Sequence, residues 1–310
     1  MERVADCGRR AAWLLSLLVV ALALLVPVAE PAQEPERRRP VLVGAVTVYA
    51  VRPGDTVSRV GAIHGAGVSA LARDNGLATD AKLAVGQLLR VDNRHIAPAS
   101  LDGGTLIINV PQRMLFYDAD DGGLVGYPVA VGRSGWQTPT REFVVVMKER
   151  EPTWDVPASI LEESRRQGRV QPARVPPGPN NPLGAFWIGL SLPGIGIHGT
   201  NAPSSIFRAA THGCIRMTPE DIARLFPRIS IGTPGRTIYE PVLVAVQDGA
   251  VYLEVHPDIY RRDARPARDV ARALAKTAGL SDWIDWSAAD VVAAAREGIA
   301  RDVTRASLRR

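Results

Sequence analysis

The stretch HGTNAPSSIFRAATHGCIRM, which runs from His198 to Met217, carries the residues that decide the fold and the chemistry of this chain. It places Cys214 two residues after His212 and sixteen residues after His198. A thiol attacks as its thiolate, so it needs a base or a positive environment nearby, and histidine is the natural base near neutral pH. Gly213 lets the backbone approach a substrate carbonyl closely, as an oxyanion hole requires. The stretch therefore predicts a cysteine nucleophile served by histidine.

Two other interpretations of the same residues stay open at this point. A lone buried cysteine is usually a small core residue without chemistry. His198, His212 and Cys214 could instead supply three zinc ligands. However, two of those ligands would share one tight turn, and no carboxylate follows in a metalloprotease pattern. The chain has only two cysteines, which excludes a zinc framework or a disulfide scaffold. We therefore expect neither a metal nor an organic cofactor.

Residues 103–240, which surround this stretch, are rich in β-forming side chains. We expect a mainly β domain, similar to a sandwich, with a short helix after Cys214. Apolar runs broken by turn residues predict strands at residues 106–110, 113–117, 124–131 and 143–148. Thr218 is the predicted cap of the short helix, with Pro219 at its first position and Asp221 completing the capping pair.

Two segments of the second half differ from this β pattern. Residues 171–184 hold five prolines and predict a long irregular loop, which is either a lid over the cleft or an ordinary surface loop. Residues 241–310 form a C-terminal extension that is rich in alanine and arginine near its end. We expect this extension to be helical after residue 257.

Residues 46–92 form a small separate module with the predicted order strand, helix, helix, strand. A short alternating strand is followed by a Pro-Gly-Asp turn, two capped helices and a second strand. The apolar and turn positions resemble those of a LysM module: Tyr49, Val51, Gly54, Asp55, Thr56, Leu71, Asn75, Leu77, Leu83, Gly86, Leu88 and Val91. Because LysM modules bind the N-acetylated glycan of peptidoglycan or chitin, the resemblance implies glycan binding. A generic helix pair packed on a hairpin is the alternative.

The first 29 residues predict a secretory signal or an N-terminal anchor. Three arginines precede an uncharged apolar run at residues 11–26, and small residues follow it, which is typical of a secretory signal. The run is also near the length that spans a bilayer, so an uncleaved anchor is the alternative. Residues 30–45 are rich in proline and charge and predict a linker. We therefore expect an exported protein of the periplasm or cell envelope, which an uncleaved segment would anchor to the inner membrane.

Length and composition limit the remaining classes of function. A length of 310 residues suggests two modules, and 46% hydrophobic with 22% charged residues is typical of a globular chain. The net charge is only +5, from 37 basic and 32 acidic side chains, and it is spread along the chain. A nucleic-acid-binding protein would need a concentrated basic face with stacking aromatics, so we expect no nucleic-acid partner.

The motif Thr211–Cys214, with His198 upstream, resembles the active-site signature of the L,D-transpeptidase family. The continuation Ile215–Met217 is similar to the periplasmic branch, whereas some other branches carry Asn at the position of Arg216. Three further segments resemble that branch: Val131–Thr140, Pro152–Pro157 and Pro176–Gly184. The resemblance covers residues 49–256 and leaves the rest of the C-terminal extension unmatched.

The resemblance implies a role for each reactive residue. Cys214 is the nucleophile, and His198 is the general base and later the acid. The backbone carbonyl of Gly199 orients His198 as the third member of a triad. His212 lines the pocket, although spacing alone does not decide which of the two histidines is the base.

The resemblance also implies how the substrate is held. Backbone N–H groups at Gly213 and Cys214 form the oxyanion hole. Arg216 pairs with a substrate carboxylate, because its guanidinium offers a bidentate fork, and a solvent-facing charge on the turn is the alternative. Thr211 is a further candidate for substrate binding.

The function that the resemblance implies is transpeptidation on peptidoglycan. Cys214 would attack the carbonyl of the third residue of a tetrapeptide stem, meso-diaminopimelate, release D-Ala and form a thioester, and carbapenem-type β-lactams would acylate the same thiol. An amine then resolves the thioester, either from another stem, giving a 3→3 crosslink, or from a lysine of an outer-membrane lipoprotein. Two alternatives remain open. Water could resolve the thioester, which would make a peptidoglycan-peptide hydrolase, or the chain could be a non-catalytic wall-binding LysM protein.

Overall fold

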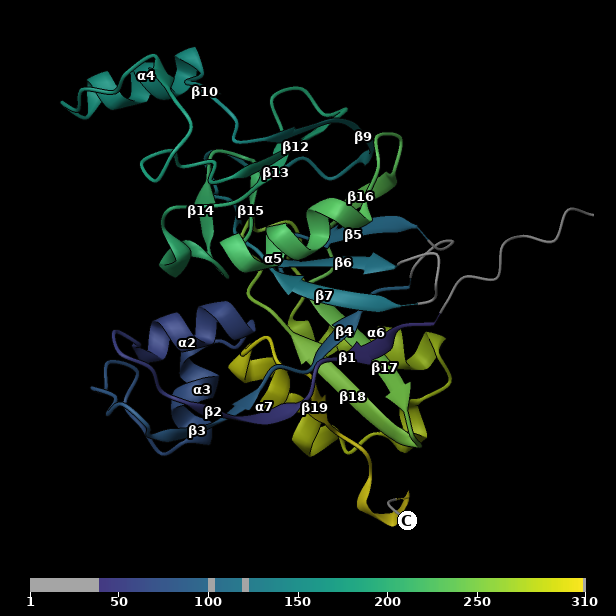
Figure 1. Ribbon diagram of the computed structural model, residues 1–310. Coiled ribbons are helices and arrows are strands. Elements are labelled where there is room, and N and C mark those ends of the chain that lie inside the picture. Colours follow the sequence, from purple (N-terminus) through teal and green to yellow (C-terminus); the bar gives the residue numbers. More distant parts are fainter. Residues whose placement is uncertain (1–38, 100–103, 119–122, 309–310) are drawn as a thin grey trace, which may run out of the picture. The chain divides into compact units, whose positions relative to one another are not determined.

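The computed structural model describes residues 39–99, 104–118 and 123–308 (Figure 1). The chain divides into two compact units, residues 1–36 and 37–310, and all the described residues belong to the second. The predicted signal or anchor at residues 1–29 therefore lies outside the described residues. Within the described ranges, no helix combines the length and the apolar character needed to cross a membrane.

The LysM-like module has the predicted order of elements. Its strands are β2 (Val46–Ala50) and β3 (Leu88–Asp92), which pair antiparallel, and its helices are α2 (Val57–His64) and α3 (Val68–Asp74). The last part of the predicted linker at residues 30–45 is a strand rather than irregular chain. There Val41–Val43 forms strand β1, because its backbone pairs antiparallel with β4 (His95–Ala97), directly after the module.

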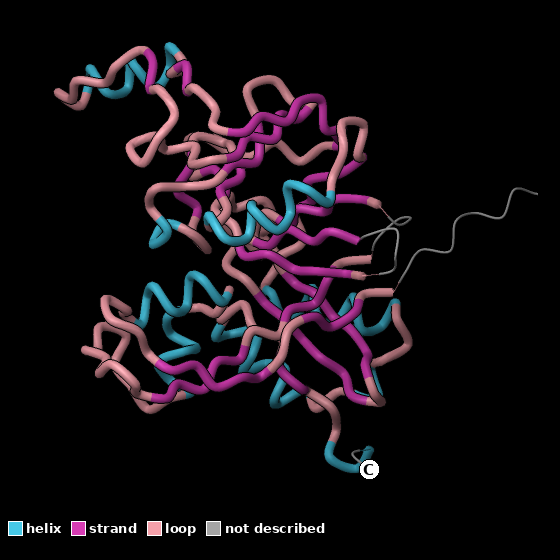
Figure 2. The backbone as a smooth tube through the Cα atoms, viewed as in Figure 1, coloured by secondary structure: helices cyan, strands magenta, loops and turns pink. Residues whose placement is uncertain are grey.

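The middle of the chain forms a domain dominated by strands, called here the β domain (Figure 2). Its largest sheet has eight strands in the order β15-β13-β12-β9-β16-β5-β6-β7. These strands are β5 (Thr105–Asn109), β6 (Met114–Asp118), β7 (Leu124–Pro128), β9 (Glu142–Arg150), β12 (Phe186–Leu190), β13 (Gly196–His198), β15 (Ile215–Arg216) and β16 (Pro234–Ile238). Most neighbours are antiparallel, but β13 pairs with β15 and β16 pairs with β5 in parallel. A separate parallel pair joins β8 (Val131–Gly132) to β14 (Ala209–Thr211).

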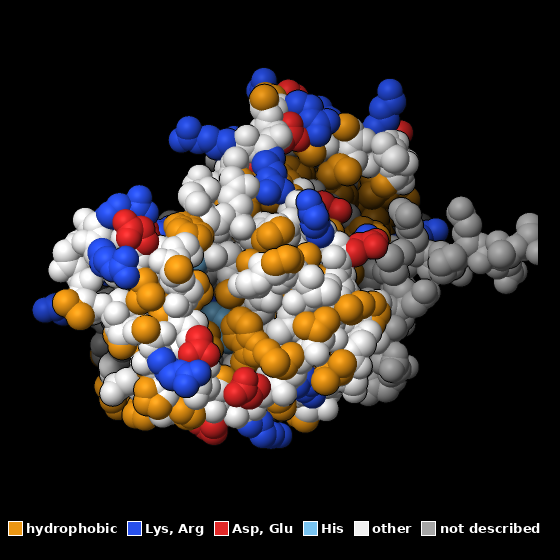
Figure 3. All heavy atoms as spheres, turned by 90° about the horizontal axis from the view of Figure 1, so that it is seen from above, with side chains coloured by type: hydrophobic (Ala, Val, Ile, Leu, Met, Phe, Trp, Pro, Cys, Tyr) orange, Lys and Arg blue, Asp and Glu red, His pale blue; other side chains and the backbone are white. Residues whose placement is uncertain are grey.

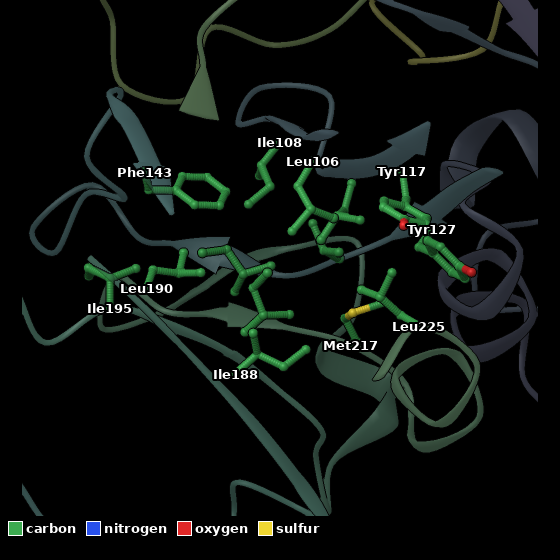
Figure 4. Close-up of a cluster of buried hydrophobic side chains, with 14 of the residues drawn as sticks. Leu106, Ile108, Tyr117, Tyr127, Phe143, Ile188, Leu190, Ile195, Met217 and Leu225 are labelled. Atoms are coloured by element: carbon green, nitrogen blue, oxygen red, sulfur yellow. The ribbon is translucent and has the colours of Figure 1, made fainter. Parts of the chain in front are cut away.

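The core of the β domain lies between this sheet and helix α5 (Pro219–Leu225), which continues into the short 3₁₀ helix η2 (Phe226–Arg228). Figure 4 shows side chains from several strands pointing into this core, together with Met217 and Leu225. The predicted cap is present, because the Thr218 hydroxyl accepts a hydrogen bond from the backbone N–H of Asp221 at 3.0 Å. The short helix after Cys214 is therefore fixed by local sequence and by burial of its apolar side.

A small outlying segment interrupts the β domain between β9 and β12. It contains β10 (Trp154–Asp155), helix α4 (Ala158–Arg166) and β11 (Arg174–Val175), and Figure 1 shows it standing off the large sheet. Another short 3₁₀ helix, η1 (Pro203–Ser205), lies in the loop after β13. The predicted irregular loop at residues 171–184 thus contains one short strand.

The C-terminal extension begins with strands and continues mainly with helices. Strands β17 (Val242–Gln247), β18 (Ala250–Val255) and β19 (Arg301–Asp302) form one sheet, and helices α6 (Ala267–Thr277) and α7 (Trp286–Ala295) pack on it. Two 3₁₀ turns complete it, η3 (Ser281–Trp283) and η4 (Ala306–Leu308). The predicted fold class is confirmed, with a mainly β domain between a βααβ module and a largely helical extension.

Positive charge is not gathered into one patch on the face that Figure 3 shows. Lysine and arginine side chains lie there in separate groups, several of them beside acidic side chains. This agrees with a net charge of only +5.

A buried polar cluster connects the three parts of the chain. The Glu254 carboxylate, on β18, is fully buried and accepts hydrogen bonds from His95 Nδ1 at 2.8 Å, Gln112 Nε2 at 3.0 Å and His256 Nε2 at 2.7 Å. His95 Nε2 also lies 2.9 Å from the carbonyl of Gly65, in the LysM-like module. Both ring nitrogens of His95 therefore face acceptors, so both must donate, and the ring is an imidazolium paired with a buried carboxylate.

The lowered pKa of Glu254 makes the stability of the fold depend on pH. Burial raises the pKa of the carboxyl, but His95 and His256 more than offset this, and the pKa falls to about 2. A carboxyl with a lowered folded-state pKa stabilises the fold above its unfolded-state value and loses this contribution as the pH falls. Burial also lowers the pKa of His256, so acid must force a proton onto a buried neutral ring. Both groups favour unfolding in acid.

We predict that Glu254→Gln lowers the free energy of unfolding by about 3–5 kcal/mol at neutral pH, because it leaves a buried imidazolium without its counter-charge. In the wild type, the free energy of unfolding should fall by about 3 kcal/mol between pH 4.5 and 2 as Glu254 takes up a proton. The variant has no carboxyl at this position, so its free energy of unfolding should not show this fall. Urea unfolding at a series of pH values measures both effects. Glu149→Gln, at an exposed position on β9, is the control. Equal stability of the two variants would contradict the prediction.

Candidate functional site

The candidate site lies at one edge of the large sheet, where β13 and β15 run parallel. Their register pairs Ile197 with Ile215 and His198 with Arg216, and both isoleucines are fully buried. Cys214 directly precedes β15. Because residues at equivalent positions of neighbouring parallel strands lie close together, this register brings the predicted base and the predicted nucleophile to the same part of the sheet edge.

His198 is held in one tautomer inside the protein. Its side chain is 4% exposed, its Nδ1 lies 2.7 Å from the carbonyl of Gly199, and the Trp187 ring stacks on it at 5.9 Å. Since a carbonyl only accepts, Nδ1 carries the hydrogen and Nε2 keeps its lone pair. Burial and the nearby Arg216 lower the pKa of His198 to about 3, and the bond to Gly199 opposes this only in part. The imidazole is therefore neutral near neutral pH and can accept a proton at Nε2.

Cys214 is half-buried, and its thiol donates to the carbonyl of Gly194 at 3.5 Å. Burial raises the pKa of the thiol, while a backbone contact at Gly196 and the charge of Arg216 lower it in part. The sequence suggested a thiolate, but the balance of these effects favours a neutral thiol at rest. The site therefore holds a neutral thiol and a neutral imidazole rather than an ion pair.

Arg216 is a partly buried cation beside both groups. Its Nη1 donates to the hydroxyl of Ser205 at 2.9 Å, and its Nε is buried without a hydrogen-bond partner among the described residues. Burial lowers the pKa of the guanidinium. A solvent-facing charge, the alternative that the sequence left open, does not fit these contacts. Because this Nε has almost no accessible surface, an acceptor on a ligand could reach it only if the surrounding groups move.

The turn before Cys214 is held by the side chain of Thr211. The Thr211 hydroxyl donates to the carbonyl of Cys214 at 2.6 Å and accepts from the N–H of Gly213 at 3.2 Å. Gly213 has φ of 109°, and a Cβ there would lie 2.9 Å from Ile195 Cδ1. Thr211 thus acts inside the turn, although the sequence suggested substrate binding. The N–H of Gly213 is also engaged, which leaves the N–H of Cys214 as the oxyanion donor of the predicted pair.

His212 points to a different partner from His198. Its Nε2 lies 2.6 Å from the carboxylate of Glu163 on α4, the Arg133 guanidinium contacts both groups, and the Trp136 ring meets the imidazole edge-on at 5.1 Å. Hydrogen bonds to His212, and to a smaller extent to Arg133, hold the pKa of Glu163 below its usual value. With Nε2 bound to a carboxylate, only Nδ1 of His212 is left to take a proton, whereas His198 keeps the lone pair on Nε2. Sequence reasoning missed Glu163, which lies 49 residues away and carries no motif.

The zinc interpretation finds no support in the arrangement of ligand atoms. Among the described residues, only His95, Glu254 and His256 bring three ligand-type atoms within 4.8 Å of one another. These are the members of the buried cluster between β4 and β18, in which both histidines hydrogen-bond to the Glu254 carboxylate, and they are not the three predicted zinc ligands. His198 and His212 instead direct ring nitrogens to Gly199 and Glu163.

Comparisons with known proteins match two parts of the chain to known families. The L,D-transpeptidase catalytic domain family matches residues 103–244, and the LysM domain family matches residues 49–92. The chain is 32% identical over 210 residues to the probable L,D-transpeptidase ErfK/SrfK of Escherichia coli K12, covering 66% of this chain and 67% of that protein. It is 34% identical over 184 residues to the probable L,D-transpeptidase YbiS of the same strain, covering 58% of this chain and 59% of that protein.

The matches to the two curated relatives cover only part of each protein. The chain spans 59% to 67% of the length of these two curated relatives. Among solved structures, an L,D-transpeptidase from Mycobacterium tuberculosis H37Rv aligns with 15% identity and a TM-score of 0.35, covering 66% of this chain and 95% of that one.

We predict that Glu163→Gln loosens the outlying segment around α4 without unfolding the β domain. The substitution removes the charge that binds His212 and Arg133, so the backbone amides of α4 should exchange their hydrogens several-fold faster. Hydrogen exchange followed by mass spectrometry measures this. The control is Glu162→Gln, since the neighbouring carboxylate contacts only Arg165 and Arg166 of its own helix among the described salt bridges. Equal protection of α4 in the two variants would show that the contact does not hold the segment.

Proposed function

Because this chain belongs to the L,D-transpeptidase family, we propose that it is a cysteine acyltransferase acting on the stem peptides of peptidoglycan. The observation that carries the proposal is the pairing of β13 with β15, which brings Cys214 and a neutral, oriented His198 to one sheet edge. We propose Cys214 as the nucleophile, His198 as the catalytic base and acid, and the carbonyl of Gly199 as the group that orients the ring.

The first step forms an acyl-enzyme. His198 Nε2 takes the thiol proton as the sulfur of Cys214 attacks the carbonyl carbon of the third stem residue, meso-diaminopimelate. The resulting oxyanion is bound by the N–H of Cys214. When the tetrahedral intermediate collapses, its C–N bond breaks, His198 returns the proton to the leaving amine, and D-Ala departs. The product is a thioester on Cys214.

The second step transfers the acyl group to an amine. His198 removes a proton from the incoming amine as its nitrogen attacks the thioester, and the thiol is released. The acceptor is an amine of another stem, which gives a 3→3 crosslink, or a lysine of an outer-membrane lipoprotein. Water in place of the amine would make the chain a hydrolase, and a non-catalytic wall-binding role would leave Cys214 unreactive.

Arg216 and the LysM-like module are the proposed substrate-binding groups. The guanidinium of Arg216 is a partly buried cation whose charge acts on both His198 and Cys214, which suits a carboxylate of the stem peptide. The LysM domain match supports binding of the glycan strands of peptidoglycan. Such a substrate requires export to the cell envelope, for which residues 1–29 are the proposed signal or anchor.

We predict that Cys214→Ala abolishes formation of the thioester and of every product while leaving the fold intact, because a small side chain is lost at a half-buried position. The measurement is mass spectrometry of the products formed from purified disaccharide-tetrapeptide. A dimer with loss of D-Ala supports transpeptidation, whereas tripeptide alone supports the hydrolase. Turnover by the folded alanine variant would contradict the assignment, and an unreactive wild type would favour the wall-binding role.

We predict that His198→Ala slows acylation of Cys214 by a carbapenem by about 10²–10⁴-fold, the usual contribution of a general base. His212→Ala is the matched control and should slow it much less, because His212 is bound to Glu163. Intact-protein mass spectrometry gives both rates.

The pH profile of the wild type tests the same assignment. Since the pKa of His198 is about 3, the base stays unprotonated in mild acid, and the acylation rate should be nearly constant between about pH 5 and 7. A midpoint near the ordinary histidine value of about 6.5 would contradict this. In the comparison of variants, a larger fall in the acylation rate for His212→Ala than for His198→Ala would make His212 the base instead of His198.

A further inference from the structure

We propose that Thr138 and Tyr260 are positioning residues that hold the peptide bond between Gly213 and Cys214 in the orientation that binds the oxyanion. This inference rests on the proposed acyl-transfer function and adds two residues to its machinery. Tyr260 is notable because it lies in the C-terminal extension, outside the residues 103–244 that match the catalytic-domain family.

Thr138 connects two backbone segments of the site through one buried hydroxyl. The residue is 0% exposed, and its hydroxyl donates to the carbonyl of Gly213 at 2.8 Å. The same hydroxyl accepts a hydrogen bond from the N–H of Gly132 at 2.9 Å. A threonine hydroxyl has one hydrogen, so the acceptance from Gly132 commits that hydrogen to the carbonyl of Gly213.

The geometry of the peptide bond carries this constraint to Cys214. The carbonyl of Gly213 and the N–H of Cys214 belong to one planar trans unit and point in opposite directions. A hydrogen bond that fixes the carbonyl therefore fixes the direction of the N–H. The neighbouring peptide units are fixed as well, because the N–H of Gly213 and the carbonyl of Cys214 both bond to the Thr211 hydroxyl. An oxyanion donor held in this way needs no reorganisation when charge develops.

Tyr260 closes the turn on which Thr138 sits. Its hydroxyl accepts from the backbone N–H of Thr138 at 3.0 Å and donates to the carbonyl of Gly132 at 2.6 Å. The side chain is only 7% exposed, so these bonds compete little with water. The turn itself is tight, because a Cβ on Gly132 would lie 2.1 Å from the carbonyl oxygen of Trp136.

The segment that carries Tyr260 is fixed on the same turn by further contacts. The rings of Tyr239 and Tyr260 stack at 5.5 Å, and the Arg262 guanidinium lies over both. Arg262 also donates to the Thr140 hydroxyl and to the Gln137 side chain, each at 2.9 Å. Tyr260 and Arg262 of the extension therefore both hydrogen-bond to residues of the turn around Thr138.

Two reactions of the same thiol separate positioning of the oxyanion from general integrity of the site. In acylation by a carbapenem, the Cys214 sulfur bonds to the lactam carbonyl carbon, the ring C–N bond breaks, and the ring nitrogen receives the thiol proton, so an oxyanion forms on the way. In alkylation by iodoacetamide, the sulfur bonds to a methylene carbon and iodide leaves, and no oxyanion forms. Loss of one oxyanion donor typically costs about 10²–10³-fold.

We expect Thr138→Val to slow acylation by about 100-fold and Tyr260→Phe by about 10-fold, while both variants keep the wild-type rate of alkylation. Thr138→Ser keeps the hydroxyl and should restore most of the acylation rate. Tyr117→Phe is the control, since Tyr117 is equally buried and its hydroxyl donates to the carbonyl of Arg228, away from the site. This control should change neither rate.

The possible outcomes are distinct. Wild-type acylation in the Thr138→Val and Tyr260→Phe variants, or an equal fall of both rates in them, overturns the positioning role. Failure of the serine variant to recover acylation also overturns it, because the hydroxyl would then not be the cause. If the wild type is alkylated but never acylated, the proposed acyl-transfer function itself fails, and the positioning role fails with it.

Discussion

The parallel pairing of β13 with β15, only two residues long, is the constraint on which the candidate site depends. Ile197 and Ile215 are fully buried opposite each other, so any slip of one strand past the other would remove an apolar side chain from the core. That register brings His198 beside the end of the turn that carries Cys214. The N–H of Met217 donates to the carbonyl of His198 at 2.8 Å, which ties the same pair of strands to the start of α5.

The electrostatics of the site follow from burying these groups together. Burial opposes charge on both His198 and Cys214, and Arg216 adds a positive charge that opposes imidazolium while it favours thiolate. These effects favour a neutral resting pair. On the proposed mechanism, a fixed donor such as the N–H of Cys214 matters more in a site of this kind, because the negative charge forms in surroundings that stabilise it poorly without such a donor.

Local signals in the sequence predicted the parts of the structure that depend on neighbouring residues. The cap at Thr218 and the order of elements in the LysM-like module are of this kind, and a motif suggested the grouping of His198 with Cys214. Other contacts could not be predicted because the partners are far apart in sequence: Glu163 lies 49 residues before His212, and Tyr260 lies 128 residues after Gly132. The burial that keeps the Cys214 thiol neutral is likewise set by packing rather than by adjacent residues.

The buried cluster around Glu254 limits how far the LysM-like module can be treated as an interchangeable part. Its carboxylate is satisfied by His95, which directly follows the module, and by Gln112 in the β domain, while Gly65 inside the module holds the other side of the His95 ring. A chimera that received a foreign LysM module would have to reproduce the contact at Gly65. Without it, a charged ring would be left half-bonded in the interior. The module and the C-terminal extension are therefore structurally coupled, because the His95 ring bonds to Gly65 on one side and to Glu254 on the other.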